Sequence, residues 1–229
     1  MKTKLKSFVC AALVAAVTTT SMTGCKSGCP FSSKKVLTYE NKDFYKDGKF
    51  DAAKAKQAYY ALMKRFNYPI YPALKTDQFW AVDFSLGDFV NVGMGGVFWA
   101  NFNHKGGGYL GHDIFLLPGQ MIVEHSHSKV PGICPPKRES WLIRNGSVYS
   151  FSVKDKPTGF PEGVKIPESQ KGFTTVNSCR LVKAGEVDTM NGDCKKHFIM
   201  AGPEGAIVTE FATFHSNDGL RFTNPKVKF

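Results

Sequence analysis

Several features that mark common protein classes are scarce or missing in this sequence. The chain of 229 residues has only six cysteines, and no two are spaced as CxxC, which argues against a zinc site built from cysteine. The apolar run from Phe8 to Val17 is too short to span a bilayer as a helix. Acidic residues are fewer than basic ones, 19 against 30, but the basic residues are scattered and form no stripe with aromatics. We therefore exclude a nucleic-acid partner and interpret the positive charge as a solvated surface beside anionic lipid.

The start of the chain is typical of an exported bacterial lipoprotein. Three lysines precede the apolar run, and the segment from Ser21 to Cys25 resembles a lipobox, in which the cysteine is acylated and becomes the new N-terminus. We expect residues 1–24 to be a lipoprotein signal peptide, Cys25 to carry the lipid and residues 25–46 to be a polar tether. The protein would then be anchored to a membrane of the bacterial cell envelope. The alternative is an ordinary signal peptide that is cleaved nearby.

The cysteines after this segment are Cys29, Cys134, Cys179 and Cys194. An even number in an exported protein permits disulfides. A hairpin that turns at residues 184–185 would set Cys179 opposite Met190 instead of Cys194, so strand register disfavours a bridge between the nearest pair. We expect free, partly buried thiols.

Hydrophobic periodicity predicts one helix followed by many short strands. Residues 51–66 place Ala55, Tyr59 and Leu62 on one face at helical spacing, and Asp51 can cap the start. Beyond the helix, turn residues interrupt short apolar segments roughly every eight to twelve residues, which favours an all-β barrel or sandwich in a single domain over 47–229. The expected strands are 79–84, 95–102, 109–117, 121–127, 139–144, 147–153, 174–182, 186–190, 197–201 and 206–214.

Two of the six histidines stand out because they lie two residues apart on an expected strand. His125 and His127 then point to the same face, which in a barrel can be the interior. Two imidazoles inside a barrel indicate a shared metal ion, and Glu139 at the start of the next expected strand offers a carboxylate. Nitrogen and oxygen ligands of this kind suit Mn, Fe, Zn, Ni or Co.

The spacing of these residues is similar to that of the cupin superfamily. The sequence resembles the first cupin motif at Gly119, His125, His127, Glu139 and Gly146. His197, which follows an expected turn at residues 191–193, resembles the histidine of the second cupin motif. The stretches 118–141 and 197–214, and the NYPIYP sequence after the helix, resemble the sugar-isomerase cupins related to D-lyxose isomerase. This resemblance covers about residues 50 to 225.

The resemblance implies a single cupin (jelly-roll) barrel with one N-terminal helix, and it implies a function for six residues. The metal ligands would be His125, His127, Glu139 and His197. The cofactor would be one divalent ion, Mn in the first place and otherwise Zn, Fe, Co or Ni. The catalytic residues would be Lys137 as an electrostatic partner and Glu210 as the base. Glu210 shares a strand face with small side chains, which leaves room for a ligand in front of it.

The activity that these residues imply is the interconversion of an aldose and a ketose of the D-lyxose/D-xylulose type, by metal-assisted proton transfer through an enediol. The partner would be a small sugar, and the sequence leaves a homodimer open. Two alternatives use the same barrel: a non-catalytic sugar-binding lipoprotein, which needs no metal, and another metal-dependent cupin enzyme such as an Fe(II) dioxygenase. Glu210 and Lys137 favour the isomerase, because oxygenases seldom need a carboxylate that moves protons.

Overall fold

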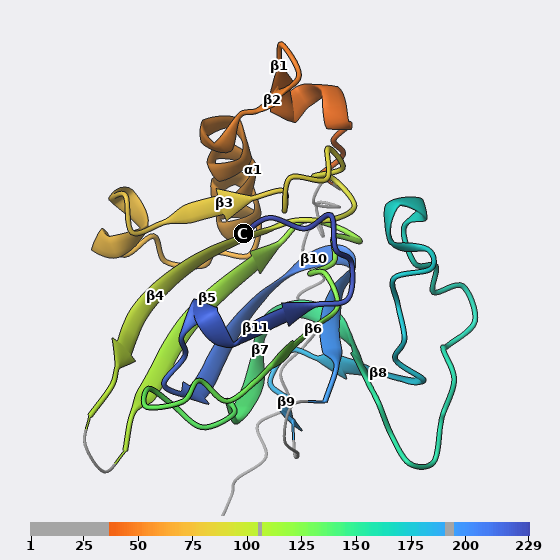
Figure 1. The fold of residues 1–229 in the computed structure, drawn as a ribbon. Helices are drawn as coiled ribbons and strands as arrows, with labels where there is room; N and C mark the ends of the chain where they lie inside the picture. The colour runs from red at the N-terminus through yellow and green to blue at the C-terminus, as the bar shows by residue number, and fades with distance from the viewer. Residues whose placement is uncertain (1–36, 105–106, 191–194) are drawn as a thin grey trace, which may run out of the picture. The chain divides into compact units, whose positions relative to one another are not determined.

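The computed structural model describes residues 37–104, 107–190 and 195–229, which form a curled antiparallel sheet with one α-helix against it (Figure 1). The helical segments are η1 (Asn41–Phe44), α1 (Ala52–Arg65), η2 (Pro72–Lys75), η3 (Glu168–Gln170) and η4 (Asn217–Gly219), where η marks a 3₁₀-helix. The strands are β1 (Tyr45–Lys46), β2 (Lys49–Phe50), β3 (Trp80–Val82), β4 (Met94–Phe102), β5 (Tyr109–Leu116), β6 (His125–His127), β7 (Glu139–Ser152), β8 (Ser178–Lys183), β9 (Val187–Met190), β10 (His197–Thr213) and β11 (Leu220–Phe222).

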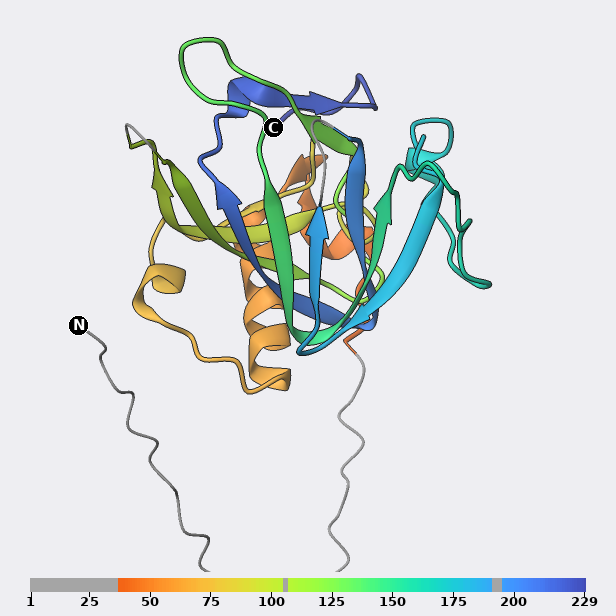
Figure 2. The same ribbon diagram turned by 90° about the horizontal axis from the view of Figure 1, so that it is seen from below.

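The larger sheet curls into a barrel, and its longest strand, β10, is part of the wall (Figure 2). The strands β11, β6, β10, β5, β4 and β3 are neighbours in that order, and β7 pairs with β10, β8 and β9. The first half of β10 pairs with β7 and meets β6, while its second half lies between β5 and β7. The all-β single barrel with one N-terminal helix, which the sequence predicts, is confirmed.

Two strands are longer than the sequence indicates. The segments 139–144 and 147–153 belong to the single strand β7, and the segments 197–201 and 206–214 belong to β10. Gly146 and Gly205 have φ values of 72° and 82°, and the pairing of the two strands shifts register there. A β-carbon on Gly146 would lie 2.0 Å from the carbonyl oxygen of Gly205. These glycines therefore mark a bend in two continuous strands instead of turns that end them.

The strands β8 and β9 both pair with β7, one after the other along its length. Met190 lies opposite Glu139, and Cys179 lies opposite Phe151. The predicted hairpin that sets Cys179 against Met190 is therefore wrong, because the long strand β7 pairs with both segments. Cys179 is a buried free thiol and Cys134 is a partly buried one. Cys29 and Cys194 lie outside the described residues.

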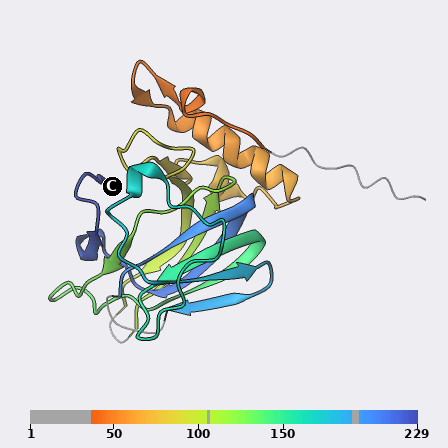
Figure 3. The ribbon, with the colours of Figure 1, turned by 90° about the vertical axis from the view of Figure 1, so that its right-hand side faces the viewer.

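Helix α1 covers the outer face of the sheet (Figure 3). Asp51 accepts a hydrogen bond from a backbone N–H of the first turn, as predicted, and Asn67 follows the helix in the left-handed conformation, with φ 54°. On the buried side of the helix, the ring of Tyr59 lies 6.3 Å from that of Phe79 and 6.4 Å from that of Phe115. This outer core holds the helix against the strands that carry the site.

The folded region begins before residue 47. Residues 41–44 form η1, residues 45–46 pair with β2, and Phe44 is 2% exposed with its ring 4.7 Å from that of Phe89. The polar tether predicted for residues 25–46 is therefore wrong over 41–46, because an aromatic side chain there packs into the outer core. The part of the tether up to residue 36 lies outside the described residues.

Alternate residues of β5 and β10 face opposite sides of the sheet. Ile114 and Val208 pack inside the barrel, whereas Phe115 and Ile207 pack against α1. Glu210 shares the inner face with Val208 and lines a cavity there. The strand faces predicted for residues 206–213 therefore agree with the structure.

Candidate active site

The interior of the barrel contains a cavity lined by apolar and polar side chains, which is the usual character of a small-molecule site. Its wall is largely aromatic and includes Trp80, Phe84, Phe98, Trp141, Phe222 and Phe229. Its polar lining consists of His112, His125, His127, Lys137, Glu139, Glu210 and His215. The remaining predicted site residue, His197, lies beside this lining, with its ring 4.5 Å from the ring of His125. The structure therefore brings all six predicted site residues into one region.

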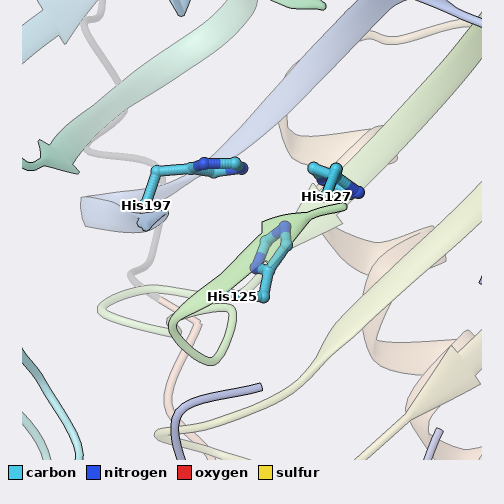
Figure 4. A group of neighbouring side chains, drawn as sticks. All are labelled: His125, His127 and His197. Atoms are coloured by element: carbon cyan, nitrogen blue, oxygen red, sulfur yellow. The ribbon is translucent and has the colours of Figure 1, made fainter. Parts of the chain in front are cut away.

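Three histidines meet where β6 lies beside β10. His125 and His127 come from β6, and His197 begins β10 directly opposite His125 in the register. One nitrogen of each ring lies within 4.8 Å of those of the others. Figure 4 shows the three rings gathered around the space between the two strands. His197 is thus within ligand reach of the other two, as the resemblance implies.

Hydrogen bonds determine which ring nitrogens face the cluster. Nδ1 of His125 lies 2.9 Å from the carbonyl oxygen of Val123, and Nδ1 of His197 lies 2.8 Å from that of Lys195. Because a carbonyl oxygen only accepts, both Nδ1 atoms donate, which leaves Nε2 with its lone pair for the cluster. Hydrogen bonds of this kind orient histidines that bind metals.

Glu139, the first residue of β7, adds a carboxylate to the three rings. Its Oε1 lies 2.9 Å from Nε2 of His197 and 3.5 Å from Nε2 of His127, and its side chain is 4% exposed. Lone pairs that face one another at these distances are stabilised by a cation between them. Three imidazoles and one carboxylate suit a divalent transition metal, so the four residues fit the predicted ion.

The electrostatics favour the metal-binding protonation states of His125, His127 and Glu139 at neutral pH, whereas a metal ion at His197 would have to displace a proton. Burial, and next the nearby His197, lowers the pKa of His125 to about 3, and burial holds the pKa of His127 well below its usual value. Burial also lowers the pKa of His197, but Glu139 more than offsets this and the pKa is raised. Burial raises the pKa of Glu139, but Lys137 and His197 outweigh it and hold the pKa well below the usual range. Neutral imidazoles and an ionised carboxylate are what a metal ion requires.

Lys137 connects the cluster to Glu210. Its Nζ lies 2.9 Å from Oε2 of Glu139 and forms a still closer ion pair with Oε1 of Glu210. The lysine side chain is 7% exposed. Burial alone lowers the pKa of Lys137, but the two carboxylates more than offset this and raise it. A buried ammonium group therefore bridges a predicted metal ligand and the predicted base.

Two further histidines, which the sequence pattern does not single out, reach the cavity. Nδ1 of His112, on β5, lies 3.1 Å from Oε2 of Glu210. The ring of His215, after β10, lies 5.1 Å from that of His127, and its Nε2 lies 3.1 Å from Oδ1 of Asn217. Burial lowers the pKa of His215 to about 4. Each is a lone histidine in the sequence, and only strand pairing could have placed His112 beside Glu210.

No family model matches the sequence, but curated relatives do. The D-lyxose/D-mannose isomerase of Thermosediminibacter oceani is 32% identical over 169 residues, which are 74% of this chain and 88% of that protein. The chain belongs to the D-lyxose isomerase family. The D-lyxose ketol-isomerases of Thermofilum sp. and Cohnella laeviribosi are 33% and 31% identical over 146 residues, which are 64% of this chain and 77% and 76% of those proteins. The chain is therefore a sugar isomerase of the aldose–ketose type, and the predicted cupin branch is confirmed.

Solved structures share the fold of this D-lyxose isomerase family member. The L-ribose isomerase of Acinetobacter sp. DL28 in complex with L-ribose superposes with a TM-score of 0.60 at 16% identity, over 76% of this chain and 91% of that one. The L-ribose isomerase of Cellulomonas parahominis with L-psicose gives a TM-score of 0.59 at 15% identity, over 75% and 90% of the two chains. At such identities the likeness shows the fold alone.

The prediction of a membrane lipoprotein is corrected by these relatives. The three relatives described above are named as sugar isomerases, and their names describe no lipoprotein. Within the described part of the chain, no helix is both long and apolar enough to cross a membrane. The signal peptide predicted for residues 1–24 and the lipidation predicted at Cys25 lie outside the described residues. The oligomeric state and the location in the cell stay predictions.

Proposed function

We propose that this chain is a metal-dependent ketol-isomerase that interconverts D-lyxose and D-xylulose. The observation that carries the proposal is the unbroken series of contacts in one cavity that runs from His197 through Glu139 and Lys137 to Glu210. Such a series places a base next to a set of metal ligands, which is what aldose–ketose isomerisation needs. The names of the three relatives support D-lyxose as the aldose.

The divalent ion would be held by the three clustered histidines and Glu139, and we propose Mn²⁺, with Zn²⁺, Fe²⁺, Co²⁺ and Ni²⁺ compatible with the same ligands. When bound, such an ion polarises the sugar carbonyl and offsets negative charge on the sugar oxygens. His125 and His197 present Nε2 to it because their Nδ1 atoms are committed to backbone carbonyls. These two local hydrogen bonds therefore orient the imidazole rings of His125 and His197 before a metal ion binds.

Glu210 moves the proton between the two carbon atoms. Conversion of the aldose to the ketose transfers one proton from C2 to C1 and a second from O2 to O1, so atoms and charge balance without any oxidant. Glu210 is buried on the inner face of β10 and can take the proton from C2 and return it to C1. As a carboxylate that lines the cavity, it would face a sugar bound there.

Lys137 keeps this chemistry electrically balanced. Its ammonium group contacts both Glu139 and Glu210, and the raised pKa keeps it charged at neutral pH. Positive charge fixed at this place stabilises an enediolate that forms beside it, and no solvent has to reorganise. The aromatic wall, with Trp80 and Trp141, offers flat apolar surfaces against which the carbon skeleton of a sugar can pack.

The test is an isomerase assay on purified protein that has been stripped of metal and reloaded with Mn²⁺. We expect D-lyxose to give D-xylulose, the stripped protein to be inactive and the rate to be independent of oxygen. D-Xylose is the matched control substrate, because it differs from D-lyxose only in the configuration at C2 and gives the same ketose. Consumption of oxygen would instead support a dioxygenase, and sugar binding without turnover of any pentose or hexose would support a binding protein.

A further inference from the structure

Glu210 is held by two groups, one on each carboxylate oxygen. Lys137 forms an ion pair with Oε1, and Nδ1 of His112 lies 3.1 Å from Oε2. His112 and Glu210 are each 4% exposed, and they are direct cross-strand partners in the pairing of β5 with β10. The proposed mechanism uses Glu210 and Lys137 but gives His112 no part.

The ring of His112 packs against two aromatic rings, which also contact each other. Its centroid lies 4.1 Å from that of Phe98 and 5.6 Å from that of Trp80, with interplanar angles of 20° and 29°. Gly96 on the neighbouring strand leaves the space for this stack, because a β-carbon there would lie 2.4 Å from Nε2 of His112 and 2.6 Å from the ring of Trp80. The imidazole therefore has little freedom to turn away from Glu210.

The backbone beneath the pair is also fixed, from the opposite face of the sheet. The preceding residue of β10, Thr209, is the cross-strand partner of Asp113, and its Oγ1 donates a hydrogen bond of 2.7 Å to Oδ1 of Asp113. Two consecutive cross-strand pairs thus carry side-chain hydrogen bonds, one on each face. The position of Glu210 relative to β5 is set by both.

We propose that His112 is a positioning residue for Glu210, an inference that rests on the proposed function. A carboxylate oxygen only accepts, so His112 donates its Nδ1–H to Oε2 and fixes the orientation of the carboxylate. Oε1 remains in contact with Lys137. In this role His112 acts through the geometry of Glu210.

Two substitutions separate this role from a purely structural one in the aromatic stack. His112→Asn keeps an N–H close to the place of Nδ1 and removes the ring, whereas His112→Phe keeps a stacking ring and removes the donor. We expect His112→Phe to lower kcat about tenfold or more with KM changed less than about twofold, because the loss falls on the transition state. We expect His112→Asn, which keeps a donor, to lose less activity. It should recover at least about a third of the loss in log kcat that His112→Phe shows relative to the parent protein.

The opposite ranking, with His112→Phe near the parent and His112→Asn strongly impaired, would overturn the proposal in favour of a packing role. Both variants are compared at equal metal content and below their unfolding temperatures, so that lost folding is not mistaken for lost positioning. If neither variant folds, the tautomer of His112 in the parent protein decides whether the proposal holds.

Nitrogen-15 NMR of histidine-labelled parent protein provides that measurement without any turnover. We expect the His112 ring to be protonated on Nδ1, the minor tautomer of free histidine, because Glu210 accepts from that atom. A ring protonated on Nε2 with a bare Nδ1 would refute the hydrogen bond and with it the proposal. If the parent protein converts no sugar, the proposed function fails, and the tautomer still shows whether His112 holds Glu210.

Discussion

The outer face of the strands packs an apolar core against α1, whereas the inner face adds a buried cluster of histidines and charged side chains to its apolar lining. On the outer face, Phe115 of β5 is fully buried among Tyr59 and Phe79 beneath α1. On the inner face, His112 and Glu210 are each 4% exposed, and they carry a buried histidine–carboxylate contact. Residues only three apart in the sequence thus serve an apolar core and a polar cavity.

This difference separates the residues that stabilise the fold from the residues of the candidate active site. Apolar area removed from water contributes roughly 25 cal/mol per Å², so the outer face supports folding directly. Buried charges lose hydration worth several kcal/mol each, which their mutual attraction offsets only when the geometry is favourable. The histidines, carboxylates and lysine of the inner face are therefore better explained by chemistry than by stability.

The largest effect is expected when the outer face is broken. Phe115→Ala should lower the free energy of unfolding by about 3–5 kcal/mol, because it removes a fully buried ring and leaves a void. The matched control is Phe211→Ala, at a phenylalanine on β10 that is 46% exposed, where a change within about 0.5 kcal/mol is expected. Urea unfolding monitored by circular dichroism measures both. Equal losses for the two variants would contradict the division between the faces.

The outer face is also the part of the fold that the sequence predicts well. The helix over 51–66 is confirmed as Ala52–Arg65, since apolar spacing and an Asp51 cap are local signals. The bends at Gly146 and Gly205 look like turns in the sequence, because a glycine with positive φ has the same local pattern whether the chain reverses or only bends. The strand Leu220–Phe222 escapes prediction, since three residues show no period.

The next largest effect is expected when the inner face loses its base. Glu210→Gln keeps the shape of the side chain and removes the proton acceptor, so isomerisation should fall by about 10²-fold or more, the lower end of what a general base contributes. Metal content and unfolding temperature should change little. Glu204→Gln is the control, because Glu204 is on the same strand with its side chain 63% exposed. Turnover close to the parent in the Glu210 variant would assign the base to another residue.

The candidate site could be predicted only where its residues share a short motif. His125, His127 and Glu139 lie within one stretch, and the resemblance supplies His197 and Glu210 from a second. His112 lies 98 residues from Glu210, and their contact arises from the pairing of β5 with β10. A single histidine carries no local signal of such a contact, so the structure was needed to find it.

An effect of similar size, on metal affinity, is expected when one cluster histidine is removed. His127→Ala deletes one of the four proposed ligands and should weaken Mn²⁺ binding by more than the roughly 10-fold to 100-fold that loss of an outer hydrogen-bond partner costs at metal sites. The matched control is His104→Ala, since His104 is exposed outside the cavity. Elemental analysis after dialysis against a fixed Mn²⁺ concentration compares the two. Unchanged metal content in the His127 variant would remove this residue from the ligand set.

The smallest effect is expected from a polar contact on the outer face, where Asp113 accepts hydrogen bonds from Tyr71 at 2.5 Å, Tyr68 at 3.0 Å and Thr209 at 2.7 Å. Tyr71→Phe removes one of these donors and leaves two, so the free energy of unfolding should fall by about 1 kcal/mol. Tyr109→Phe is the control, because Tyr109 is on the same strand as Asp113 and is 51% exposed. Urea unfolding of both variants measures the difference. A loss as large as that of Phe115→Ala would mean that polar contacts, and not the apolar core alone, determine the stability of the outer face.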